Sequence, residues 1–365
     1  MRVNDSSMQS DNRPVNADPE LILKSVAQQL FHRLGGVRLV RRINRHAARI
    51  LMYHRFNNPA QLNKQCIFLK RCYEPLSMRR LSECLQSGEP FPPNSVAITV
   101  DDGYREFLRV AFPVFAEHGI PVTVFLVSDF LDRKTWLWPD LLKYAFERTK
   151  RIRANFDCPD GSSFSALLDS PLLRVQGARK AIEAAKRFAN NDRLLFMCSL
   201  SEHLGVRIPQ EMPEEFQPLS WDEVRSLARD GVEFGAHTKT HPILSKISDD
   251  RELRDEIAGS KRRIEEEINA PILYFGYPNG RPADISDAAL AAVRGANFAT
   301  AVTAESGLIP KGTDRFLLRR IGVSPEIPEY DFRQRVAGFR ISAATDEDLN
   351  LTPTLAARKC QEKGL

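Results

Sequence analysis

The chain has 365 residues, of which 42% are hydrophobic and 27% charged, and its formal net charge at pH 7 is +5. This composition is that of a globular protein, and the small positive excess gives no ground for nucleic-acid binding. No run of about 20 apolar residues indicates a membrane span. The polar first residues lack the apolar segment of a secretory signal, so we expect a cytoplasmic protein, free or bound peripherally to a membrane.

The first 48 residues divide into a polar tail and a basic segment. Residues 1–19 lack apolar periodicity and predict a disordered tail. Residues 20–48 have helical spacing, and arginines alternate with aliphatic residues in their second half. These arginines are Arg33, Arg38, Arg41, Arg42 and Arg45, with Arg49 just beyond. Such a segment packs one face on the domain or lies on an anionic membrane surface, and the pattern favours the first.

Seven strand-like runs follow, with helical patterns between most of them. The runs are residues 49–53, 96–100, 121–127, 232–236, 272–277, 298–302 and 317–323. Strands that alternate with helices predict a parallel sheet, and seven units favour closure into a barrel of the TIM type over residues 49–325. Residues 326–365 are predicted to form a C-terminal helix and a polar tail.

The interval between the third and fourth strands is far longer than the others. Residues 130–219 contain three helical patterns and no strand-like run, so we predict a helical insertion that caps the barrel. A separate small domain is disfavoured because strands and clear linkers are missing. Trp136 and Trp138 near its start either form core or stack on sugar rings, and aromatic residues at such spacing more often form core.

Polar side chains gather where the predicted strands end. The carboxyl ends of parallel strands share one rim, which is where ligands bind in such folds. His54 follows the first strand, Asp101 and Asp102 follow the second, and a Pro-Asn-Gly turn follows the fifth. His237 and His241 follow the fourth strand in the sequence HTKTH.

The two histidines and one of the aspartates form a candidate metal site. Imidazoles four residues apart share one face of a helical turn and can bind one ion. A divalent cation between them and Asp102 would also relieve the repulsion between the adjacent carboxylates. Three protein ligands leave positions open for water and substrate, as in catalytic sites, and Asp101 is then free to act as general base. The alternative, two solvent-facing histidines, leaves the aspartate pair unexplained.

Four motifs resemble those of the polysaccharide deacetylases of the NodB-homology type, carbohydrate esterase family 4. They are TVDDG (99–103), HTKTH (237–241), YPNG (277–280) and the YH of LMYH (51–54). The resemblance spans residues 49–325 and implies a distorted (β/α)₇ barrel. It also implies Asp101 as base, zinc or else cobalt, nickel or manganese on Asp102, His237 and His241, and the backbone N–H of Asn279 as oxyanion donor.

Two positions depart from the family pattern. The arginine expected two residues before Pro278 is replaced by Gly276, and the last motif, LLRRIGV, lacks the histidine that acts as general acid. Alternation along a strand lets only one of Arg319 and Arg320 face the site, and we take Arg320 as the replacement for the arginine. His54 is a candidate proton donor, with a structural role as the alternative.

These observations predict a metal-dependent hydrolase that removes N-acetyl groups from an amino-sugar polysaccharide, oligosaccharide or glycolipid precursor. One alternative keeps the site but changes the substrate to another small amide, a formamide or an O-acetyl ester. Another, motivated by the missing arginine and histidine, is a catalytically weak carbohydrate-binding protein. Contact with an anionic membrane through the basic segment is a further hypothesis.

Overall fold

The computed structural model describes residues 35–339. The expected tail at 1–19, the first part of the basic segment (20–34) and the end of the C-terminal segment (340–365) lie outside the described residues. Within 35–339, no helix is long and apolar enough to span a bilayer.

Seven parallel strands close into a barrel, which confirms the predicted fold. Each corresponds to one of the predicted runs, and the last pairs with the first to close the ring. Around the ring the strands are β1 (Arg49–Tyr53), β3 (Ser95–Val100), β4 (Val122–Leu126), β7 (Glu233–Ala236), β8 (Tyr274–Gly276), β9 (Thr300–Ser306) and β10 (Leu318–Gly322).

A short extra strand distorts the barrel. β2 (Glu74–Leu76) pairs with the first half of β3, on the same edge that β4 occupies along the second half. Every residue of β1, β3 and β4 is buried, because helices cover the outside of the ring and side chains fill its interior.

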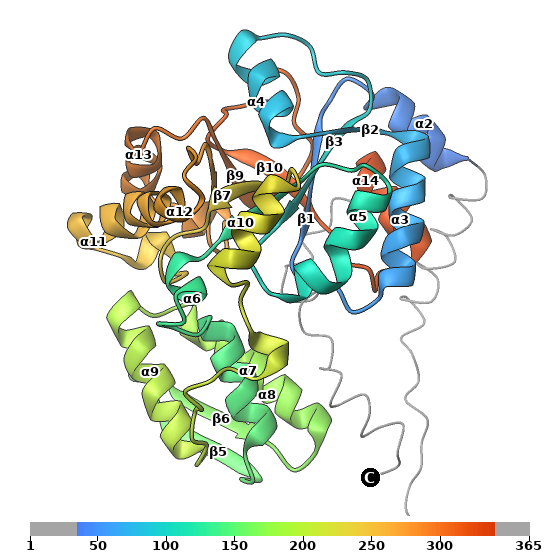
Figure 1. Cartoon of the computed structure of the whole chain (residues 1–365). Coiled ribbons are helices and arrows are strands. Elements are labelled where there is room, and N and C mark those ends of the chain that lie inside the picture. Colours follow the sequence, from blue (N-terminus) through green and yellow to red (C-terminus); the bar gives the residue numbers. More distant parts are fainter. Residues whose placement is uncertain (1–34, 340–365) are drawn as a thin grey trace, which may run out of the picture.

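Helices surround the barrel (Figure 1). They are α2 (Gly36–Ile43), α3 (Pro59–Cys72), α4 (Met78–Ser87), α5 (Phe112–Glu117), α6 (Ser128–Leu131), α10 (Trp221–Arg229), α11 (Asp250–Arg254), α12 (Ser260–Ile268), α13 (Asp287–Gly295) and α14 (Glu329–Ala337). A π-helical turn, Phe107–Ala111, precedes α5, and another, Asp255–Gly259, joins α11 to α12. α10 begins with a capping box between Ser220 and Glu223.

The insertion contains two strands that the sequence analysis did not predict. Between α7 (Trp138–Arg148) and α8 (Pro171–Ala185) lie β5 (Arg153–Asp157) and β6 (Ser163–Leu167), paired as an antiparallel hairpin, and α9 (Asn190–His203) follows. Each strand buries few apolar side chains, such as Phe156 and Phe164, so its alternation is too short to stand out.

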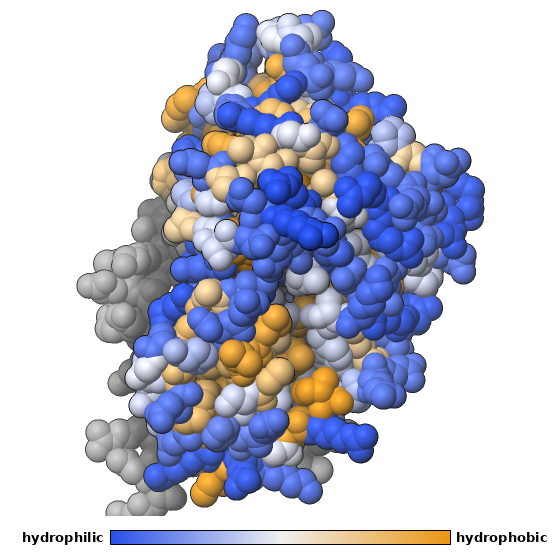
Figure 2. All heavy atoms as spheres, turned by 90° about the vertical axis from the view of Figure 1, so that its left-hand side faces the viewer, coloured by the Kyte–Doolittle hydropathy of each residue, from blue (hydrophilic) through white to orange (hydrophobic). Residues whose placement is uncertain are grey.

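The insertion has a hydrophobic core of its own. Its buried residues form a cluster separate from the barrel core, drawn from α7, both strands, α8 and α9. In Figure 1 it lies at one end of the barrel, and Figure 2 shows apolar atoms at its surface. Exposed leucines of the insertion are Leu167, Leu172, Leu194 and Leu195.

Candidate metal centre

Asp102, His237 and His241 converge beyond the ends of β3 and β7. Their potential ligand atoms lie within 4.8 Å of one another, and all three residues are buried. Asp102 Oδ1 is 3.8 Å from His237 Nε2 and 3.5 Å from His241 Nε2. The histidines lie on a loop rather than on the helical turn that we predicted, and positive φ angles at Thr238 (65°) and His241 (61°) fold that loop back.

The donor set fits a divalent cation. The buried Asp102 Oδ1 has no hydrogen-bond partner, although it faces two imidazole nitrogens. His237 Nδ1 lies 2.7 Å from the carbonyl oxygen of Gly276. Because a carbonyl only accepts, Nδ1 carries the proton and the Nε2 lone pair is left for a metal.

The pKa values of these three side chains also fit a cation-binding site. Burial raises the pKa of Asp102 to about 7, lowers that of His237 to about 4 and lowers that of His241 well below its usual value. The imidazoles are therefore held neutral, which is the form that binds metal. A cation among these groups would stabilise the ionised form of the Asp102 carboxyl.

The loop that carries His237 and His241, the histidine loop, is held by Glu256 and Trp138, whose contacts with it the sequence analysis did not predict. Glu256, from the π-helical turn, accepts hydrogen bonds from the backbone N–H groups of Lys239 and Thr240 and from the Thr240 hydroxyl, at 2.9, 3.0 and 2.6 Å. Trp138, at the start of α7, donates its indole N–H to the His241 carbonyl at 3.2 Å. The insertion therefore contributes directly to the position of a candidate metal ligand.

Asp101 stays outside the donor set and is paired with Arg320. The guanidinium forms two parallel hydrogen bonds of 2.7 Å to the carboxylate oxygens, and both residues are at most 2% exposed. Burial raises the pKa of Asp101, but Arg320, joined to a lesser extent by His237, outweighs it and holds the pKa well below its usual range. Arg319 points outward to Glu305, as strand alternation predicts.

Arg320 is itself fixed in place. Its Nε donates to the Thr303 carbonyl at 2.8 Å, and the guanidinium lies 5.7 Å from the centre of the Phe125 ring. The first contact comes from the adjacent strand β9 and the second from β4, so barrel strands set the orientation of the arginine before any substrate arrives.

His54 and Asn279 lie on the loops that follow β1 and β8. His54 follows β1, and its Nε2 is 3.7 Å from Asp101 Oδ2. Asn279 lies in the loop after β8 with a φ of 56°, three residues beyond Gly276, whose carbonyl orients His237. The structure thus brings His54 to the predicted base and leaves Asn279 on the loop where we expected it.

A buried polar network links this rim to the insertion. The Tyr104 hydroxyl donates to Asp140 of α7 at 2.5 Å, and Lys143 pairs with the same carboxylate at 3.1 Å. The guanidinium of Arg55 stacks on the Tyr104 ring at 4.1 Å. Tyr104 is two residues after Asp102, so the insertion contacts both loops that carry the candidate ligands.

Comparisons with known proteins agree with this geometry. A family model described as polysaccharide deacetylase matches residues 88–154 and 188–301. The poly-β-1,6-N-acetyl-D-glucosamine N-deacetylase of Escherichia coli K12 is 32% identical over 60 residues, which are 16% of this chain and 9% of that protein. The chain thus spans about a tenth of the curated relatives that it matches.

Solved structures share the fold. A Streptococcus pyogenes deacetylase, PplD in complex with acetate, matches with a TM-score of 0.53 and 17% identity over 80% of this chain and 99% of its own. IcaB from Ammonifex degensii matches with a TM-score of 0.52 and 16% identity, covering 80% and 97%. The chain belongs to the polysaccharide deacetylase family.

Proposed function

We propose that this protein is a metal-dependent hydrolase that removes N-acetyl groups from an amino-sugar polysaccharide. The observation that carries the proposal is the buried Asp102–His237–His241 donor set with an ionised, unligated Asp101 beside it. Family membership supports it, as do the names of the similar proteins, which describe N-deacetylation of a poly-N-acetylglucosamine in one case.

Zinc is the ion that we expect on Asp102, His237 and His241, because two imidazoles and one carboxylate suit it, with cobalt, nickel or manganese as alternatives. When bound, it would lower the pKa of a coordinated water and polarise the acetamide carbonyl. The protein supplies the remaining groups.

Asp101 is the proposed general base. It accepts a proton from the attacking water, and Arg320 holds both carboxylate oxygens so that the acceptor lone pairs keep one orientation. The backbone N–H of Asn279 is the proposed donor to the negative charge that develops on the carbonyl oxygen. These groups come from three strand ends of one rigid barrel, which favours preorganisation.

The C–N bond then breaks, and the leaving nitrogen needs a proton. His54 is the proposed donor, because its Nε2 lies 3.7 Å from the carboxylate that has just taken up a proton. If His54 has only a structural role, Asp101 can donate the proton that it took from the water to the leaving nitrogen. Acetate and a free amino sugar are the products.

Acetate release from N-acetylglucosamine oligomers, measured with purified protein loaded with zinc, tests the proposal. Asp101→Asn should abolish turnover and keep the metal, whereas His237→Ala should lose both, with metal content read by elemental analysis. A panel of formamide and O-acetyl substrates identifies the acyl group. Full metal content in His237→Ala would refute the assigned donor set, and oligomer binding without acetate release at saturating metal would refute the activity.

A further inference from the structure

The charge of the chain is unevenly distributed. Residues 21–73 carry eleven lysines and arginines and no aspartate or glutamate, and Glu74 is the first acidic residue after this stretch. The described part of the stretch forms α2, β1 and α3, and the two helices lie on one side of the barrel (Figure 1). Arg49 is buried in β1 and Arg55 stacks on Tyr104, whereas the other basic residues of this part belong to the two helices or to the turn after α2. Neither the metal site nor the proposed reaction accounts for this excess.

The outer face of α2 combines cationic and aliphatic side chains. Val37 is buried against the barrel, whereas Leu39 and Ile43 are 61% and 70% exposed, one turn apart. Arg38 and Arg42, also exposed and one turn apart, lie next to them around the helix. Exposed aliphatic residues this large are not needed for solubility, and burial in an apolar phase would be favourable.

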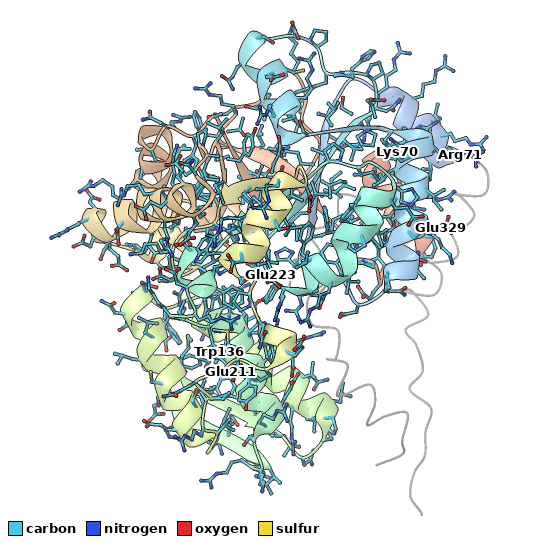
Figure 3. The ribbon with its side chains drawn as sticks, viewed as in Figure 1. Lys70, Arg71, Trp136, Glu211, Glu223 and Glu329 are labelled. Carbon is cyan, nitrogen blue, oxygen red and sulfur yellow. The ribbon has the colours of Figure 1, made fainter. Side chains whose placement is uncertain are left out.

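α3 extends the same surface. Arg41 donates to the carbonyl of Cys72 at 3.2 Å, which joins α2 to the end of α3. Lys70 and Arg71 project from that end beside α2 (Figure 3), and Ile67, one turn earlier, is 51% exposed. Within residues 35–339, no carboxylate pairs with Arg38, Arg42, Lys70 or Arg71.

We propose that this basic aliphatic face of α2 and α3 docks the protein on an anionic membrane surface. A peripheral membrane helix needs basic side chains that attract anionic lipid headgroups. It also needs neighbouring aliphatic side chains that enter the boundary between headgroups and acyl chains. A nucleic-acid backbone would satisfy the charges but would offer nothing to Leu39, Ile43 and Ile67.

The docking face and the metal centre lie at opposite ends of the barrel. α2 leads into the amino end of β1, whereas Asp102 and His237 follow the carboxyl ends of β3 and β7. Bound through α2, the protein would direct its metal centre away from the bilayer. Docking therefore favours a polymer in water over a sugar attached to a lipid headgroup as the substrate.

Co-sedimentation of the full chain with vesicles tests the proposal without reference to activity. We expect at least tenfold tighter binding to phosphatidylcholine vesicles with about 30% phosphatidylglycerol than to phosphatidylcholine alone, and loss of that preference in Arg38→Glu/Arg42→Glu. Leu39→Ser/Ile43→Ser should weaken binding several-fold at unchanged charge. The matched control is Arg251→Glu/Arg254→Glu on α11, across the barrel, which makes the same charge change and should bind as the parent does.

Acetate release from a soluble oligomer should be the same in all of these variants, which shows that they are folded and separates failure of docking from failure of the proposed reaction. Equal binding to both vesicle types, or equal losses in the α2 and α11 variants, would overturn the proposal. So would binding of α2 to heparin or to an acidic protein without any binding to vesicles.

Discussion

Replacing Arg320 by glutamine should turn Asp101 from an ionised group into a largely neutral one. Among residues 35–339, Arg320 is the only basic residue that hydrogen-bonds the Asp101 carboxylate, and its replacement would leave the burial of that carboxylate unchanged. Asp102 shows the consequence: it is about as buried, lacks such a partner and has a pKa raised by burial to about 7. We therefore expect the pKa of Asp101 in the metal-free variant to rise toward that value.

The size of the effect follows from linkage. In the parent protein the folded pKa lies below the unfolded value of about 3.9, so the ion pair stabilises the fold above that pH and the contribution is lost as pH falls through the folded pKa. In the variant, a folded pKa near 7 lies above the unfolded value, so the Asp101 carboxyl destabilises the fold as pH rises. This lowers the free energy of unfolding by about 4 kcal/mol at pH 7, and the cost is absent at pH 3. This agrees with the roughly 3–5 kcal/mol for breaking one half of a buried pair.

Urea unfolding of chelator-treated protein at several pH values measures this directly. The free energy of unfolding of Arg320→Gln should be closest to that of the parent at the lowest pH at which both are folded. The difference between the two should grow as the pH rises toward 7. Arg319→Gln is the control, because its ion pair with Glu305 is half exposed and should contribute less than about 1 kcal/mol at any pH. The same loss for both variants, or a loss for Arg320→Gln that does not grow with pH, would refute the reasoning.

Three further outcomes follow from the metal centre. Zinc at about a thousand times its dissociation constant should stabilise the chelated parent by about 4 kcal/mol, seen as a higher midpoint of thermal unfolding, and His237→Ala should show no shift. Trp138→Phe keeps an aromatic ring but removes the hydrogen bond to the His241 carbonyl, so it should weaken zinc binding about tenfold in a competition titration. Trp221→Phe is the control, because the indole of Trp221 bonds to Asp132 and not to the loop of His237 and His241, and it should leave zinc binding unchanged. Glu256→Gln retains the size of the side chain but removes the negative charge that accepts three hydrogen bonds. Calorimetry should show weaker zinc binding, and acetate release at saturating zinc should change little.

The strands and the strand-end residues could be predicted because both depend on short-range features of the sequence. An apolar run between helical patterns indicates a buried parallel strand, and the residue after it must lie on the common rim. This is how Asp102 and His237, 135 positions apart in the chain, could be placed together without any pairwise information. Alternation likewise separates Arg320 from Arg319.

Contacts of the insertion could not be predicted, because they depend on how it folds back on the barrel. Trp138 reads as a core residue, and it is one, but its indole N–H reaches a backbone carbonyl 103 residues away. The hairpin of β5 and β6 was missed because strands of five residues with two buried side chains in β5 and one in β6 give no more signal than a loop. The loop form of HTKTH depends on positive φ angles that a spacing of four does not reveal.

The absence of an arginine at position 276 has a structural reason. A Cβ on Gly276 would lie 3.0 Å from His237 Nδ1 and 3.1 Å from the Phe125 ring, so any side chain there would disturb the histidine that the Gly276 carbonyl orients. Arg320 reaches Asp101 from β10 instead and passes over the same Phe125 ring. In this barrel the guanidinium that pairs with the proposed base therefore comes from β10, and the packing around His237 is left undisturbed.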